Sequence, residues 1–527
     1  MLLSALAACV AQAPPSVEAP VPEPDVESRI GLLRGAVGPA SVRIVWVDGL
    51  FVSVEKADGD TGEGWISAGL VDAHAHPASL GRKLATLDVT GTTSYAEVIS
   101  RIEGAEGDGW ITGRGWDQND WTDAPEGGWP LAADLKTDRP VAMSRVDGHA
   151  LWVNAAALKA ASITAETPDP DGGRIVRDAS GAPTGVLVDH AMDLVPIPAA
   201  SPSESKRRLE KAVAYIAGKG LTGVHDMGIG DGTVALYEEL DRAGELPIRV
   251  HAYVSPDSEA AARLLRVGPW KIDRFSVVGI KVAADGALGS RGALLTEPYT
   301  DEPGHVGLVT TPVERIAELA TGLLAVEAQL AVHAIGDAAV RGTLDAFGRA
   351  REAHPDKGHV PLRLEHAQVV RPEDMGRFKD VGAIASMQPT HCTSDMPWAP
   401  DRLGPERTSW AYRWRDFLDL GIPLAFGSDF PVEAVDPGLG LWSATTRRAL
   451  DGTPDGGWQA DQILTLDEAV DAFSSGAAVA LGRSGEVLAP GKAADLTVWT
   501  TEETEAGPRH RAVMTIVGGD VVFDQEG

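Results

Sequence analysis

The sequence predicts an α/β protein whose main domain is a closed (β/α)8 (TIM) barrel. A small composite β-sandwich built from both ends of the chain, and a large insertion after the first barrel strand, complete the predicted architecture. Three observations predict it. First, eight short apolar strands recur along the middle of the chain. Second, helical sequence separates several of them, for example at 204–218 and 312–329. Third, β-rich sequence lies at both ends of the chain. Alternating strands and helices form a parallel sheet, which eight such units close into a barrel.

Composition narrows the function classes. The 527 residues include 46 Lys and Arg against 76 Asp and Glu, a net charge of −30. So negative a surface repels phosphate backbones, which makes a nucleic-acid partner a poor expectation. The expected partner, a small-molecule substrate, follows from the motifs described below and not from the charge. No apolar run approaches the roughly 20 residues that span a bilayer. Oligomeric state stays open.

The N-terminal segment resembles a lipoprotein signal. Leu6-Ala7-Ala8-Cys9 matches a bacterial lipobox, and Pro, Ala and acidic residues dominate the stretch that follows. We therefore expect residues 1–28 to be a signal and Pro-rich linker, Cys9 to be lipidated, and the protein to be exported and anchored only through that lipid. Only eight residues precede Cys9, and the first basic residue is Arg29, whereas a signal peptide needs a basic segment and an apolar run. Either the natural start lies upstream or the match is accidental, and a cytoplasmic location is the alternative.

Both ends of the chain predict β-structure. Residues 42–55 alternate between apolar and polar positions, and so do 494–499 and 513–523, which contain a Gly-Gly turn. This period of two is typical of half-buried strands. We therefore expect residues 29–66 and 482–527 to form one composite β-sandwich.

The middle of the chain, 67–481, supplies the barrel. Its predicted strands are 69–76, 221–228, 247–254, 277–286, 329–337, 362–370, 383–391 and 423–430. Most gaps fit a single crossover helix, but the first is far longer. Residues 84–205, rich in Gly, Trp and Asp, are therefore expected to be an insertion that covers the barrel mouth.

Metal-ligating side chains follow several of these strands. Active sites of such barrels lie at the carboxyl ends of the strands, and residues i and i+2 of a strand share a face. Imidazole and carboxylate ligands suit Zn²⁺ or a similar divalent ion. Lone histidines are weak signals, since His225 and His251 also fall on predicted strands, but the joint pattern predicts a metal centre. Its expected ligands are His74, His76, Lys281, His333, His366 and Asp429.

Lys281 needs a separate argument. A buried ammonium beside a divalent metal is penalised by desolvation and by like charge. A neutral amine instead reacts with CO₂ to give a carbamate, an anionic ligand that can bridge two metals. We expect this carboxylation, with one or two ions per chain. The alternative is a lysine that pairs with Asp285 or extends towards solvent.

Several motifs together resemble one family. They are GLVDAHAHP (69–77), GRGWDQNDW (113–121), VDGHALWVN (146–154), GIKVAADGALGSRGALL (279–295), FGSDFPVE (426–433) and PGKAADLTVW (490–499). The chain is similar to metal-dependent hydrolases of the amidohydrolase superfamily, in the subgroup of N-substituted formamide deformylase (amidohydrolase family 3). The resemblance implies the barrel, the composite β-unit and the six-residue metal centre with a carboxylated lysine. Asp189-His190 departs from the Gly-Val-Leu-x-Glu stretch of relatives, so a role carried over to that position is in doubt.

The expected reaction is hydrolysis of a carbon–nitrogen bond other than a peptide bond, in an amide, formamide or cyclic amide. A metal-activated hydroxide attacks, and Asp429 serves as general base. His149 and Arg291, in turns near strand ends, are candidate oxyanion donors or structural turn residues. Trp116, Trp121 and Trp152 are expected either to line an apolar substrate pocket or to pack the insertion.

Three alternatives remain. A mononuclear deaminase does not need Lys281, and Glu365, next to His366, is expected to point to the opposite face of its strand, away from the site. An ester or lactone hydrolase uses the same hydroxide. A tethered binding lipoprotein with a relic site is the non-enzyme alternative, although all six ligand positions are filled.

Overall fold

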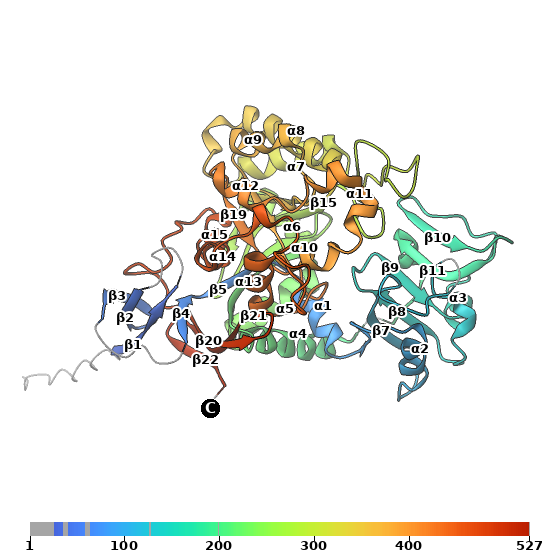
Figure 1. The fold of residues 1–527 in the computed structure, drawn as a ribbon, viewed down its shortest axis with the longest axis horizontal. Coiled ribbons are helices and arrows are strands. Elements are labelled where there is room, and N and C mark those ends of the chain that lie inside the picture. Colours follow the sequence, from blue (N-terminus) through green and yellow to red (C-terminus); the bar gives the residue numbers. More distant parts are fainter. Residues whose placement is uncertain (1–25, 35–39, 58–63, 126–127, 199, 526–527) are drawn as a thin grey trace, which may run out of the picture.

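The computed structural model describes residues 26–34, 40–57, 64–125, 128–198 and 200–525. Three sheets organise them (Figure 1). A parallel barrel occupies the centre, a sheet from both chain ends lies on one side of it, and the insertion lies on the other. The predicted fold class is confirmed.

All eight predicted barrel strands are present, and successive strands pair in parallel from the first to the last. They are β5 (Leu70–Ala75), β12 (Leu221–Ile229), β13 (Arg249–Val254), β15 (Phe275–Ala283), β16 (Gln329–Ala334), β17 (Leu362–His366), β18 (Ala383–Met387) and β19 (Leu424–Phe426). A short strand, β14 (Trp270–Lys271), pairs with β15 outside this circuit.

The seam between the first and last strands is closed by hydrogen bonds at their carboxyl ends. The Asp429 amide donates to the His74 carbonyl (2.8 Å), and the His76 amide donates to the Phe430 carbonyl (2.9 Å). Deeper in the seam, the Ser428 hydroxyl donates to the buried Asp72 carboxylate, a residue 356 positions away in the chain. The barrel is therefore joined at the same residues that were predicted to bind metal.

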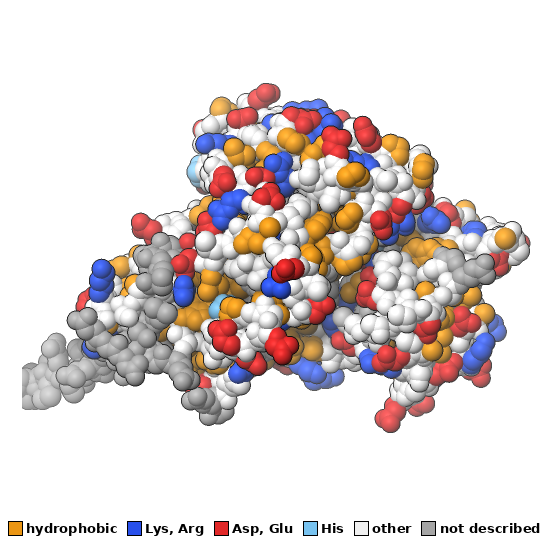
Figure 2. All heavy atoms as spheres, in the orientation of Figure 1, with side chains coloured by type: hydrophobic (Ala, Val, Ile, Leu, Met, Phe, Trp, Pro, Cys, Tyr) orange, Lys and Arg blue, Asp and Glu red, His pale blue; other side chains and the backbone are white. Residues whose placement is uncertain are grey.

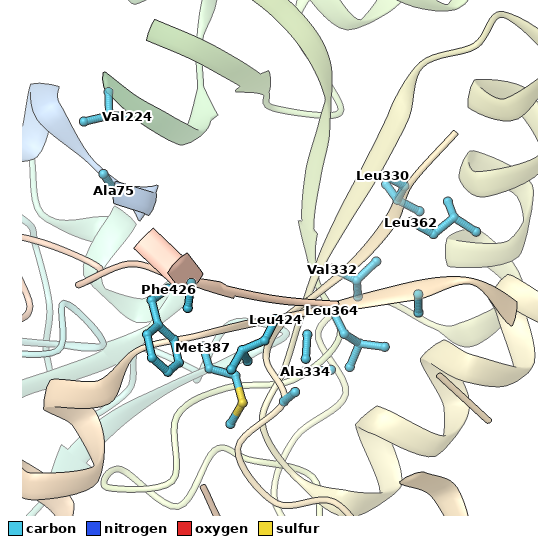
Figure 3. Packing of buried hydrophobic residues seen from close by; sticks show 14 of the residues in the cluster. Ala75, Val224, Leu330, Val332, Ala334, Leu362, Leu364, Met387, Leu424 and Phe426 are labelled. Atoms are coloured by element: carbon cyan, nitrogen blue, oxygen red, sulfur yellow. The ribbon is translucent and has the colours of Figure 1, made fainter. Parts of the chain in front are cut away.

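Alternation along the strands separates two environments. Leu330 and Leu362 pair across β16 and β17 and face the surrounding helices (Figure 3). Ala331, one position along from Leu330, packs inside the barrel against Met227 and Tyr253. Apolar side chains on both faces explain why these strands read as continuous apolar runs in the sequence.

Helices follow the strands as the sequence predicts, including the two at 204–218 and 312–329. In the first, Pro202 begins the helix and the Ser201 hydroxyl accepts a hydrogen bond from the Glu204 amide (3.2 Å), which caps it. The barrel helices are α4 (Pro202–Ala217), α5 (Asp231–Arg242), α6 (Glu259–Val267), α7 (Val313–Ala325), α8 (Asp337–Ala353), α9 (Pro372–Val381), α10 (Pro389–Asp395), α11 (Ala399–Thr408), α12 (Trp414–Asp419), α13 (Pro437–Thr446), α14 (Leu466–Phe473) and α15 (Ser475–Ala480).

The long segment between β5 and β12 builds a separate six-stranded sheet. Its strands are β6 (Leu87–Asp88), β7 (Ile111–Trp116), β8 (Val141–Arg145), β9 (Ala150–Val153), β10 (Gly173–Arg177) and β11 (Pro183–Asp189). Helix α1 (Pro77–Lys83) leads into it, and α2 (Tyr95–Glu103) and α3 (Ala155–Ala160) accompany its strands.

Both chain ends contribute to one seven-stranded sheet, in the order β22-β21-β20-β4-β1-β2-β3. Its strands are β1 (Val26–Leu33), β2 (Ala40–Val47), β3 (Leu50–Lys56), β4 (Trp65–Ala68), β20 (Leu496–Thr504), β21 (Gly507–Val517) and β22 (Asp520–Asp524). Ile44 and Phe51 share a buried core with Leu496 and Ile516 from the other end of the chain. Both ends therefore do build one β-domain, but it is a single continuous sheet and not the β-sandwich that the sequence predicts.

Cys9 and the rest of the expected lipoprotein signal lie outside the described residues. Within the described part, no helix has the length and apolar character that crossing a bilayer requires.

Candidate metal centre

A cavity of about 810 Å³ opens at the carboxyl ends of the barrel strands. His74, Lys281 and Asp429 line it from the barrel, and Arg114 and His149 line it from the insertion. The site is therefore enclosed by two parts of the chain, as expected for an insertion that covers the barrel mouth.

Four of the predicted ligands form a chain of close contacts. Asp429 Oδ1 lies 3.0 Å from His76 Nε2 and 3.7 Å from His74 Nε2. Lys281 Nζ lies 3.2 Å from His74 Nε2. These contacts join the ends of β5, β15 and β19.

The remaining two predicted ligands complete the cluster. The His366 ring centroid lies 4.8 Å from that of His74, and the His333 ring lies 4.5 Å from that of His366. His74, His366 and Asp429 each offer a ligand atom within 4.8 Å of the others. All six residues singled out from the sequence are thus brought to one place.

The left-handed backbone at two strand ends aims these side chains. His366 has φ 71° and Asp429 has φ 59°, a region that costs energy for residues other than glycine and is concentrated at functional sites. In β17 this breaks the alternation, so Glu365 and His366 both face the barrel interior. The expectation that Glu365 points away from the site is therefore wrong, since its Oε2 lies 2.7 Å from His74 Nδ1.

The histidines have the protonation state that metal binding requires. Burial, followed by the nearby Lys281, lowers the pKa of His74 to about 4. Burial likewise holds the pKa values of His333 and His366 well below the ordinary value. Three neutral imidazoles therefore face the cavity at pH 7.

Asp429 is the anion of the set. Burial alone would raise its pKa, but the interactions with His74, His391 and His76 outweigh burial, so the pKa lies well below the ordinary value. A deprotonated carboxylate among neutral imidazoles is the donor set of a divalent N/O site.

Outer partners fix which ring nitrogen faces the cluster. His74 Nδ1 lies against Glu365, His76 Nδ1 lies 3.0 Å from the Met227 carbonyl, and His366 Nδ1 lies 2.8 Å from Gln388 Oε1. Each acceptor takes the Nδ1 proton, which leaves the Nε2 lone pair for a metal. The residues present therefore fit the divalent ion that the sequence predicts.

Lys281 does not pair with Asp285. The Asp285 carboxylate instead accepts three backbone amides, from Leu294, Ile335 and Gly336, at 2.8–3.0 Å. Burial lowers the pKa of Lys281 to about 8, so the amine loses its proton far more readily than an exposed lysine does.

His149 reaches the cavity from the insertion. Its Nδ1 lies 2.7 Å from Asp189 Oδ1, and its ring centroid lies 6.5 Å from that of His333. Burial would lower its pKa, but Asp189 and Asp147 outweigh burial and raise it to about 8. Asp189, the position that departs from the family pattern, therefore orients a protonated donor.

Arg291 is not brought to this cavity, which corrects the expectation that it is an oxyanion donor. Its guanidinium pairs with Asp301 at 2.9 Å and with Glu302 at 3.5 Å. The left-handed turn at Arg291, φ 60°, directs the side chain to these carboxylates.

The tryptophans of the insertion do not line the cavity either, so the substrate-pocket expectation is corrected in favour of packing. Trp116, Trp121 and Trp152 share the buried core of the insertion with Tyr95. Trp116 Nε1 donates to the Met143 carbonyl (2.7 Å). Among the described residues, the tryptophan that lines the cavity is Trp398.

One functional pair was missed from the sequence. His391 Nε2 lies 3.4 Å from Asp429 Oδ2, and its Nδ1 lies 3.0 Å from Glu433 Oε1. Burial would lower the pKa of His391, but these carboxylates outweigh burial and raise it to about 10. The available signal was position, because His391 is the final residue of the predicted strand 383–391.

Sequence comparison with known proteins identifies one family and several of its members. A model of the amidohydrolase family matches residues 61–523. YtcJ of Bacillus subtilis (strain 168), named as an amidohydrolase, is 34% identical over 87% of this chain and 88% of its own. N-substituted formamide deformylase of Arthrobacter pascens is 26% identical, over 75% of each chain.

A solved structure agrees with the sequence relatives. An uncharacterized metal-dependent hydrolase from Pyrococcus furiosus superposes with a TM-score of 0.70 at 27% identity, covering 90% of this chain and 98% of that one. Family match, relatives and metal-ligand cluster coincide, and the chain is a metal-dependent hydrolase that belongs to the amidohydrolase family.

Proposed function

We propose that this enzyme hydrolyses a non-peptide carbon–nitrogen bond in an amide, formamide or cyclic amide. The observation that carries the proposal is the position of Asp429 between two kinds of group. Its Oδ1 faces His74 and His76, and its Oδ2 faces the protonated His391. Asp429 therefore contacts the other candidate metal ligands and also lines the open cavity, which is the position that a general base for an attacking water needs.

The metal, expected to be Zn²⁺ with one or two ions per chain, would be held by His74, His76, His333, His366, Asp429 and Lys281. When bound, it supplies Lewis acidity towards the scissile carbonyl and lowers the pKa of water towards ~7. We further propose that Lys281 is carboxylated. Its neutral amine attacks CO₂, a nitrogen–carbon bond forms, and the amine releases one proton, which leaves an anionic carbamate in place of a buried cation.

The chain's own residues then have distinct tasks. Asp429 accepts a proton from the attacking water and passes it to the leaving nitrogen, which departs as an amine. His391, held by Glu433, donates to Asp429 Oδ2 and keeps its other oxygen directed at the cluster. His149, protonated and oriented by Asp189, supplies a donor to the carbonyl oxygen as negative charge develops there.

A substrate panel tests the proposal. N-formyl and N-acyl amines, the esters with the same acyl groups, and amino-heterocycles would be incubated with the metal-loaded enzyme, while amine, alcohol and ammonia release is followed. We expect metal-dependent amine release that Asp429→Asn abolishes. Alcohol release without amine release would identify an esterase or lactonase instead. Ammonia release from heterocycles would identify a deaminase.

One relative has a substrate class in its name, and this class, the formamides, should be tested first. N-substituted formamide deformylase matches three quarters of this chain. Because specificity resides in loops and insertions rather than in the barrel, the acyl group and the amine are varied separately.

A further inference from the structure

A second cavity, of about 390 Å³, lies at the opposite end of the barrel from the metal centre. The amino-terminal parts of the strands form its walls, including Thr222, Arg249 and Ser276. Arg483 and Lys492, from the segments after α15 and before β20, complete it. Its volume lies within the range of about 300–1,000 Å³ that small-molecule sites occupy.

The charge of this cavity is opposite to that of the whole protein. Acidic side chains are spread over the face of the molecule in Figure 2, and the net charge is −30. The second cavity is lined by five basic residues and three acidic ones. The basic residues are Arg249, Lys271, Arg274, Arg483 and Lys492.

Internal ion pairs use only part of this positive charge. Arg249 makes two hydrogen bonds to Asp495, at 2.6 and 2.9 Å, and Arg274 pairs with Asp520 at 3.0 Å. Within the described part of the chain, Lys271, Arg483 and Lys492 have no carboxylate within ion-pair distance. Because five basic and three acidic residues line the cavity, its walls keep a net positive charge.

A buried histidine in the wall also lacks a partner. His225 Nδ1 lies 2.7 Å from Arg363 Nη1, and because a guanidinium can only donate, this nitrogen must be the acceptor. The proton of the neutral ring is then on Nε2. That atom is buried and has no hydrogen-bond partner among the described residues, a situation that native proteins rarely leave unsatisfied.

The neighbouring His251 shows the complementary arrangement. Its Nε2 accepts from Arg483 (3.4 Å), so its Nδ1 carries the proton and donates to the Ser276 hydroxyl (2.7 Å). The His225 and His251 rings lie 5.8 Å apart. Arg483 is thus held at the cavity by a neutral histidine, which orients the guanidinium without neutralising it.

We propose that the second cavity binds a small oxyanion, a molecule that bears a phosphate or carboxylate group. Arg483, Lys271 and Lys492 supply the positive charge, and the Nε2–H of His225 supplies a buried donor to one of its oxygens. Charge-assisted hydrogen bonds of this kind are the strong ones in proteins. This site is separate from the metal centre, and its occupant is not the substrate of the hydrolysis.

Calorimetric titration of the full metal-loaded protein tests the proposal. Inorganic phosphate and succinate serve as probes, in chloride buffers matched for ionic strength. We expect saturable binding of at least one of them, and the tighter probe identifies the preferred group. Absence of saturable binding by both would overturn the proposal.

Charge-removing variants locate the binding. Arg483→Gln and Lys271→Gln should each raise the dissociation constant of the probe about tenfold, as expected for the loss of one charge-assisted hydrogen bond. Lys159→Gln, on an exposed helix of the insertion, removes the same charge elsewhere and should leave binding unchanged. Equal binding by all three variants would refute the site. Thermal melts run in parallel show whether each variant is folded. If Arg483→Gln does not fold, the binding measured for Lys271→Gln tests the site, because Lys271 is exposed and its replacement should not affect folding.

Discussion

Replacing Glu365 by Gln should destabilise the protein by about 3 kcal/mol at pH 7. Glu365 and its partner Arg363 are both fully buried, with Arg363 Nε 2.8 Å from Glu365 Oε1. Burial raises the pKa of Glu365, but Arg363 and His74 outweigh burial and lower it from 4.5 to about 2. At 1.36 kcal/mol per pKa unit this corresponds to about 3 kcal/mol, and breaking a buried pair typically costs about 3–5 kcal/mol.

The sign of the pH dependence follows from the lowered pKa. The contribution is complete above pH 4.5, the unfolded value, and is lost as pH falls through about 2, the folded value. Urea unfolding of the chelator-treated proteins at pH 7 measures the loss. Because Glu365 also orients His74, metal affinity should fall about 10- to 100-fold in the same variant.

Glu468→Gln is the matched control. Glu468 also has a pKa lowered to about 2, because of its hydrogen bond to Arg415, which outweighs the effect of burial. This pair lies at the surface, with 35% of the Glu468 side chain exposed, so solvent screening should limit its contribution to about 1 kcal/mol or less. If both variants lose the same free energy of unfolding, burial is not what makes the Glu365 pair important.

Four further predictions follow from the site and its surroundings. Lys281→Ala should lower bound metal from about two ions per chain, measured by elemental analysis after purification with bicarbonate, and unchanged content would remove the bridging role. His149→Ala should lower kcat about 10- to 1,000-fold. In the wild type, kcat/KM should decline as pH rises through about 8, where His149 loses its proton, and the variant should lack this decline. If the decline persists in the variant, it is caused by another group. Trp152→Ala should cost about 3–5 kcal/mol of stability with KM unchanged, and a raised KM at full stability would return this residue to the substrate pocket. Cys9→Ser should move the protein from the membrane fraction to the soluble fraction of a bacterial host, and a wild type already in the soluble fraction would refute lipidation.

The eight barrel strands could be predicted because each is a short apolar run that must be buried on both faces, and their order follows from the chain. The meeting of the six candidate ligands could be predicted because strand ends meet at one edge. Both inferences need only the residue type and its position within a strand.

The side chains that were misplaced depend on information that a single sequence lacks. The direction of Glu365 is set by the left-handed conformation of His366, which period-two reasoning cannot anticipate. Arg291 follows its turn to Asp301, a pairing visible only once both loops are placed. Trp116 and its neighbours read equally well as pocket or core, and the apolar interior of the insertion determines which. His391 was the last residue of the predicted strand 383–391, but β18 ends at Met387 and His391 lies in the first turn of α10.

The closure of the barrel also determines when the enzyme can first become active. A ribosome delivers His74 early and Asp429 some 350 residues later, and the bond from Ser428 to Asp72 spans 356 positions. Until the last strand docks beside the first, Asp429 is absent from the ligand cluster and the seam is open. A chain whose synthesis stops before the last strand therefore lacks Asp429 at the cluster, which makes hydrolytic activity itself an indicator of completed assembly.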